Sequence, residues 1–155
     1  MIRSRTILAA SFVSLFLAIP AFTQEKKLNK SDLPTAVQKA VDEQSQGATV
    51  RGFSTEKENG QTIYEAQLTV NGKNRDISFD PKGSVLEVED EVAFDSLPAA
   101  VQDGLKKKAG AGKITRVETL TKKGKLVAYE AVVQNGAKKS EIQVGPDGKP
   151  LAHEE

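Results

Sequence analysis

The residue types that usually carry enzyme chemistry are scarce in this sequence. It contains one histidine, His153, two residues before the last, and no cysteine. A lone histidine at that place is expected to be solvated, and the ligand spacing of a zinc site is absent. A serine nucleophile would have no histidine base beside it. The sequence therefore predicts a protein that is not an enzyme, with no metal ligands and no cofactor.

Carboxylates are the remaining candidates for chemistry. Asp80 and the run from Glu87 to Glu91 could be imagined as calcium ligands, but they lack the alternating acidic loop that organises such a site. An acidic linker is the favoured interpretation of this run. Glu65 and Glu130 could support acid–base catalysis only within a cleft, and no feature of the sequence marks one.

Lysines form three short clusters, at 106–108, 122–123 and 138–139. No aromatic residues alternate with them, so stacking on nucleic-acid bases is not expected. Residues 24–155 carry 20 basic and 21 acidic residues, a balance that excludes a general nucleic-acid binder. The lysines are interpreted as solvated surface residues.

Three short sequence motifs, each present twice, indicate the secondary-structure elements that would position these groups. Each recurs 64 or 65 residues later: Leu33-Pro34 at Leu97-Pro98, Tyr64-Glu65-Ala66 at Tyr129-Glu130-Ala131, and Pro81-Lys82-Gly83 at Pro146-Asp147-Gly148. Three landmarks in one order at nearly one offset favour a tandem duplication. Because a unit of about 60 residues buries little surface alone, the two copies are expected to share a core.

Within each copy, a Leu-Pro pair precedes an apolar stripe of helical spacing, such as Val37 and Val41. Alternating strands and short turns follow, including Asn71-Gly72 and Asn135-Gly136. The pattern predicts an α+β fold: a helix packed on a four-stranded antiparallel sheet, made twice, at residues 31–92 and 93–155. It leaves open whether the two sheets join edge to edge or face one another.

The N-terminus has the form of a secretory signal peptide. Arg3 and Arg5 precede an apolar run over residues 7–19, and small residues follow at Ala21 and Thr23. The alternative, a membrane anchor, is disfavoured because the run is shorter than about 20 residues and Pro20 ends it.

We therefore predict removal of residues 1–23, with cleavage after Ala21 as the close alternative to cleavage after Thr23. Residues 24–30 would form a flexible polar leader. A periplasmic or secreted protein without a stable membrane anchor is expected.

Strand alternation also predicts which side chains are free to contact a partner. Tyr64 and Tyr129 head the apolar faces of corresponding strands and are assigned to the core. The opposite faces carry the candidate contact residues, which are Glu65, Gln67, Asp76 and Glu130. The partner expected on this polar surface is a protein or a peptide.

The order of these motifs resembles the PepSY-like family, whose fold is also described as β-lactamase-inhibitor-protein-like. The first copy matches at residues 33–37 (Leu-Pro-x-x-Val), 60–65 (Gly to Tyr-Glu) and 80–86 (Asp-Pro-x-Gly-x-Val-Leu). The second copy departs, since Gly145 replaces the Asp and Pro150-Leu151 replaces Val-Leu. The resemblance implies an exported bacterial binding or inhibitor module and supplies no catalytic residues.

Four functions are weighed from these observations. A non-enzymatic module that binds a protein or peptide is preferred. Inhibition of a hydrolase, either a peptidase or a β-lactamase, is the main alternative, although the polar faces lack the aromatic and arginine anchors that tight interfaces use. The others are sensing of a small ligand or metal ion in the cell envelope, and an envelope enzyme acting through carboxylates.

Overall fold

The computed structural model describes residues 25–58 and 60–155, so the predicted signal peptide lies outside the described residues. The helices there are α1 (Thr35–Gln44) and α2 (Ala99–Ala109), preceded by the 3-10 turns η1 (Lys30–Asp32) and η2 (Phe94–Ser96). The strands are β1 (Lys26–Leu28), β2 (Thr49–Glu58), β3 (Gln61–Val70), β4 (Lys73–Phe79), β5 (Val85–Glu91), β6 (Lys113–Lys122), β7 (Lys125–Asn135) and β8 (Lys138–Val144). None of the described helices has the length and hydrophobicity needed to span a membrane.

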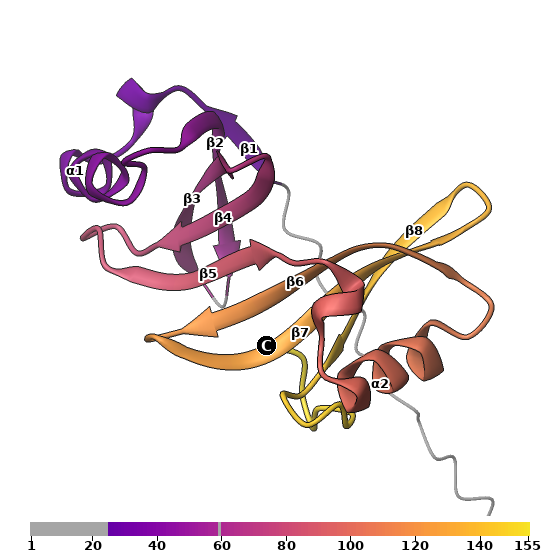
Figure 1. Cartoon of the computed structure of the whole chain (residues 1–155). Coiled ribbons are helices and arrows are strands. Elements are labelled where there is room, and N and C mark those ends of the chain that lie inside the picture. The colour runs from indigo at the N-terminus through magenta and orange to yellow at the C-terminus, as the bar shows by residue number, and fades with distance from the viewer. Residues whose placement is uncertain (1–24, 59) are drawn as a thin grey trace, which may run out of the picture.

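All eight strands form one antiparallel sheet in chain order (Figure 1). The predicted fold class, a duplicated helix on a four-stranded sheet, is therefore wrong: the described chain is mostly β, with a single continuous sheet. The joint is β5, which pairs with β4 over Val85–Asp90 and with β6 over Glu87–Glu91. A strand has hydrogen-bonding groups on both edges, and here both edges of β5 are used.

The two ends of the sheet also differ from expectation. The predicted leader contributes β1, where Leu28 lies opposite Phe53 of β2 and packs on the core. The strand predicted around Leu151 does not form, and β8 is the last strand. Pro150 explains this difference, because it has no N–H to donate to a sheet.

Each helix covers its own part of the sheet, and Figure 1 shows the two helices near opposite ends. Val37 and Val41 of α1 are buried in one apolar cluster with Phe79, while Val101 and Leu105 of α2 are buried in another. Tyr64 packs against the first cluster and Tyr129 belongs to the second, as predicted.

Both helices lie on the same face of the sheet. Val88 of β5 packs against the first cluster, and Val92, just after β5, packs against the second. Residues four apart in an extended chain point to the same side. The other face of the sheet therefore has no helix over it.

The Pro-x-Gly turns bring the chain against the start of each helix. A Cβ atom at Gly83 would lie 2.5 Å from the carbonyl oxygen of Ala36, and one at Gly148 would lie 2.0 Å from that of Ala100. Both glycines also have positive φ, +82° and +77°. Only glycine tolerates both the close approach and the positive φ. This explains why both repeated turns have glycine at this position.

Candidate functional site

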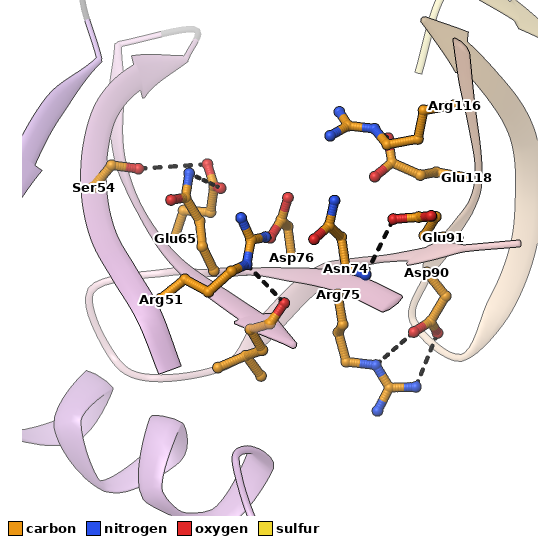
Figure 2. A network of polar contacts seen from close by, with 12 residues as sticks. Arg51, Ser54, Glu65, Asn74, Arg75, Asp76, Asp90, Glu91, Arg116 and Glu118 are labelled. Carbon is orange, nitrogen blue, oxygen red and sulfur yellow. Dashed lines mark hydrogen bonds and ion pairs between the residues drawn. The ribbon is translucent and has the colours of Figure 1, made fainter. Parts of the chain in front are cut away.

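The face of the sheet opposite the helices carries most of the clustered charge, and we call it the open face. Its polar members are alternate residues on neighbouring strands, brought side by side by the register: Ser54, Glu65, Gln67, Asp76, Ser78, Glu87, Glu89, Glu91, Arg116, Glu118, Glu130 and Gln143. The buried Leu120, opposite Glu89, lies on the same face. Figure 2 shows Glu65, Asp76 and Glu118 on this side, whereas Arg75 and Asp90 point the other way and pair with each other.

All four residues predicted to contact a partner lie on the open face. They are half-buried rather than fully exposed. Gln67 Nε2 donates to Glu65 Oε1 at 3.1 Å, and Gln67 lies opposite Asp76 in the sheet. Glu130 is on β7, where it accepts a hydrogen bond of 2.8 Å from Gln143 Nε2. The structure thus places three of them together and the fourth on the other side of β5 and β6.

The interpretation of the acidic run at 87–91 as a linker is wrong. It forms most of β5, a central strand, with Glu87, Glu89 and Glu91 on the open face and Val88 and Asp90 on the helix side. Val85, Leu86 and Val88 indicate a strand that begins here, and the structure continues it through the acidic residues to Glu91. The acidic composition obscured this continuation because glutamate and aspartate are uncommon in strands.

Glu118 is a central carboxylate that the sequence does not single out, and Glu89 was considered only as a calcium ligand within the acidic run. Carboxylate oxygens of Asp76, Glu89 and Glu118 lie within 4.8 Å of one another, a spacing that could hold a metal ion. Glu118 is 2% exposed, although it sits in a strand whose sequence gives no hint of a site. Asp80, also considered as a calcium ligand, accepts hydrogen bonds from Lys82 and Ser84 in its own turn.

Three cations offset part of this negative charge. Arg51 Nη2 donates to Asp76 Oδ1 at 2.8 Å, and its Nε donates to the Leu68 carbonyl oxygen at 3.0 Å. Arg51 reaches this place from a bulge in β2 between Val50 and Gly52. Arg116 Nε lies 3.2 Å from Glu118 Oε2. The third cation, Lys122, lies 3.2 Å from Glu87 Oε2.

Burial and crowding favour the protonated form of these carboxyls. Burial is the main cause that raises the pKa of Glu118 to about 7, against the opposing charge of Arg116. Burial also raises the pKa of Glu89 to about 9, helped by a hydrogen bond with Glu87 and by the charge of Glu130. A buried negative charge without a full complement of positive charge is costly, so protons are retained.

The predicted contact carboxylates have the same tendency. Burial raises the pKa of Glu65, Asp76 and Glu130, and each shift is reduced by a neighbour: a hydrogen bond from Gln67, the charge of Arg51 and a hydrogen bond from Gln143, respectively. The open face therefore holds more carboxylates than its own cations neutralise.

A hollow in the open face gives access to part of this cluster. Its volume is about 550 Å³, and it lies over the ends of β2, β3 and β5 beside Lys122. Its walls include Glu56, Glu65, Glu87 and Glu89. A hollow of this size admits a side chain or a short peptide segment rather than a whole domain.

An antiparallel sheet with both helices on one face and a largely polar opposite face defines the class of fold. The family described as "Putative beta-lactamase-inhibitor-like, PepSY-like" matches residues 22–83 and, in a second overlapping match, residues 62–149. These matches span most of the sequence, and the chain belongs to the PepSY-like family, as its motifs predicted. No curated protein matches the chain.

Solved structures from Bacteroides share this fold. A protein from Bacteroides eggerthii, described as one of the "putative periplasmic proteins", is 20% identical, with a TM-score of 0.61 over 77% of this chain and 86% of that one. A "BLIP-like protein" from Bacteroides fragilis is 21% identical, with a TM-score of 0.55 over 77% and 83%. A "DUF2874 family protein" from Bacteroides ovatus is 18% identical, with a TM-score of 0.58 over 77% and 84%. The predicted periplasmic or secreted location agrees with the first description.

Proposed function

We propose that this protein is an exported, non-enzymatic binding module that receives a positively charged segment of a protein or peptide on its open face. The observation that carries the proposal is the group of crowded carboxylates around Asp76, Glu89 and Glu118. A lysine or arginine side chain entering the hollow beside Glu65 and Glu87 would supply the missing positive charge.

The proposal has a definite pH dependence. Raised pKa values mean that the carboxyls of Glu89 and Glu118 keep their protons at neutral pH or near it. A cationic ligand favours the ionised form, so its binding releases protons and strengthens as pH rises from 6 towards 9. Added salt weakens the binding, because part of the attraction is between partly exposed charges.

A direct test uses two peptides of equal length, oligolysine and oligoglutamate, each with a fluorescent label. Anisotropy titrations at pH 6 and pH 8.5 should show binding of oligolysine alone, with higher affinity at pH 8.5. The variant Glu65→Gln/Asp76→Asn should lower that affinity. Both residues are half-buried on the open face, and removing their charges relieves crowding, so the variant is expected to stay folded.

The matched control is Asp42→Asn/Glu43→Gln. It removes two negative charges from α1, on the helix side, where both side chains are 62% exposed. If the control weakens oligolysine binding as much as the open-face variant does, the attraction comes from overall charge and the proposal is wrong. Failure of oligolysine to bind at either pH would also reject it. A series with calcium ions measures whether a divalent cation competes for the same oxygens.

Hydrolase inhibition is less well supported by the surface. Among residues 25–58 and 60–155, the large hydrophobic side chain with substantial exposure is Val50, at 41%. Tight inhibitors usually present exposed aromatic or arginine side chains that become buried when the complex forms. Stoichiometric addition of the protein to a panel of peptidases and β-lactamases tests this alternative, and we expect no loss of their activity.

A further inference from the structure

The sheet has two edges of very different character. The first is β1, which has three residues, two of them lysines. The second is β8, with the seven residues Lys-Lys-Ser-Glu-Ile-Gln-Val, and its first four residues are exposed. Short, like-charged edges resist pairing with other strands. The β8 edge is longer, and it carries both signs of charge.

The backbone groups of β8 that face outward can be identified. The carbonyl oxygen of Gln143 accepts a hydrogen bond of 3.1 Å from Lys108 Nζ, so it points away from β7. Main-chain groups in an antiparallel strand alternate in direction from one residue to the next. The main-chain N–H and C=O groups of Lys139 and Glu141 therefore also point away from β7. No strand within the described residues pairs with this edge.

The same edge is covered in the first half of the molecule. There β5 pairs with the outer edge of β4, placing Glu87 opposite Ser78 and Val88 opposite Ile77. The corresponding segment after β8 contains Pro150 and forms no strand. In Figure 1, the turn of the β7–β8 hairpin lies away from both helices. The first four residues of β8 beside it are exposed.

We propose that β8 pairs with β8 of a second copy of this chain, antiparallel, about a two-fold axis at Ser140. In this register Lys139 of each copy lies opposite Glu141 of the other, and both residues have outward-facing main-chain groups. Opposite charges directly across two strands are stabilising. The two pairs would exchange four backbone hydrogen bonds and extend the sheet across both copies.

Charge selects this register over its neighbours. Only residues whose main-chain groups point outward can exchange hydrogen bonds across the interface. The neighbouring registers therefore place the two-fold axis at Lys139 or at Glu141. Centring the axis on Lys139 places two lysines opposite each other, and centring it on Glu141 places two glutamates opposite each other. Like charges directly opposite are destabilising. The register at Ser140 is self-complementary, as a two-fold interface requires.

The test exploits the absence of cysteine from the chain. In the proposed pairing, the two Ser140 residues form a non-hydrogen-bonded pair with Cα atoms about 4.5 Å apart, within the range of a disulfide. Ser140→Cys should therefore form a covalent dimer under mild oxidation. The control, Lys138→Cys, is exposed on the same strand and the same face, but its two copies would be about 13 Å apart, too far to bridge.

Charge exchange tests the register independently. In the Ser140→Cys background, Lys139→Glu places two glutamates opposite each other in both pairs and should slow cross-linking by about tenfold. Adding Glu141→Lys restores opposite charges and should restore the rate. The same charge variants can be compared by sedimentation velocity in the cysteine-free protein. The parent and the double variant should self-associate more strongly than Lys139→Glu alone.

Each measurement can overturn the proposal. Equal cross-linking of Ser140→Cys and Lys138→Cys would mean random collision rather than a registered strand pair. A Lys139→Glu rate that Glu141→Lys fails to restore would reject the charge pairing. Circular dichroism of every variant checks that the sheet is intact, and these positions are exposed, so loss of the fold is not expected.

Discussion

Replacing Glu118 by glutamine should stabilise this protein in alkaline solution. Glu118 is 2% exposed, and burial raises its pKa to about 7 from an ordinary 4.5. Each pKa unit corresponds to about 1.4 kcal/mol. The ionised carboxylate therefore costs the folded state about 3 kcal/mol, a cost that its near-complete burial leaves largely unscreened.

The sign follows from proton binding. Below pH 4.5 the carboxyl is protonated in both the folded and the unfolded chain, and its contribution to stability is fully present. Between pH 4.5 and 7 the folded chain keeps a proton that the unfolded chain releases, so the free energy of unfolding falls as pH rises. Above pH 7 the full contribution has been lost. Glutamine has no proton to lose and removes this part of the pH dependence.

Urea unfolding of the parent and of Glu118→Gln, from pH 4.5 to pH 8.5, measures the effect. The variant's free energy of unfolding, minus the parent's, should rise by about 3 kcal/mol across this range. The attraction of Arg116 for the ionised carboxylate is part of this change, and the pKa of about 7 already includes it. Glu43→Gln, on an exposed part of α1, is the control and should give a flat difference. A flat difference for Glu118→Gln would refute the assigned cost of its ionisation.

Three further changes test the packing, each by chemical denaturation. Gly148→Ala should lower the free energy of unfolding by about 3 kcal/mol, because the new Cβ would lie 2.0 Å from the Ala100 carbonyl oxygen at a φ of +77°. The control Gly136→Ala has a φ of +59° and open space around it, so it should cost only about 1 kcal/mol. Equal losses of stability in the two variants would contradict the close approach at Gly148. Phe79→Ala, at a side chain with 0% exposure, should cost about 4 kcal/mol, and a loss below 1 kcal/mol would exclude it from the core. Arg75→Ala should cost less than about 1 kcal/mol, since its side chain in the ion pair is 36% exposed. A larger loss would show that the pair helps to hold β4 against β5.

Local features were predictable because they depend on neighbouring residues alone. Asn71 and Gly72 have φ values of +52° and +80°, the conformation expected of an Asn-Gly hairpin turn. The helix stripe of Val37 and Val41 is fully buried, and Tyr129 is in the core. In each case a period of two or of about 3.6 residues determined which side faces inward.

The open face could be predicted only in part. Alternation placed Glu65 and Gln67 on the side opposite the core, and the structure agrees. It carried no information about Glu118, which meets Asp76 and Glu89 only because β5 joins the two halves of the sheet. A contact between strands depends on register and strand order, and these are properties of the whole sheet.

By itself, the sequence determined most of the central strands, the turns, the helix positions and the buried faces, since each follows from local backbone preference and the pattern of apolar residues. The tertiary structure decided that β5 would pair on both edges, making one sheet from two expected ones. The physical reason is that hydrogen bonding along a strand edge is not specific to residue type, so the chain pattern does not reveal which edge meets which. That single pairing gathers the carboxylates of the open face and leaves the edge of β8 without a strand beside it.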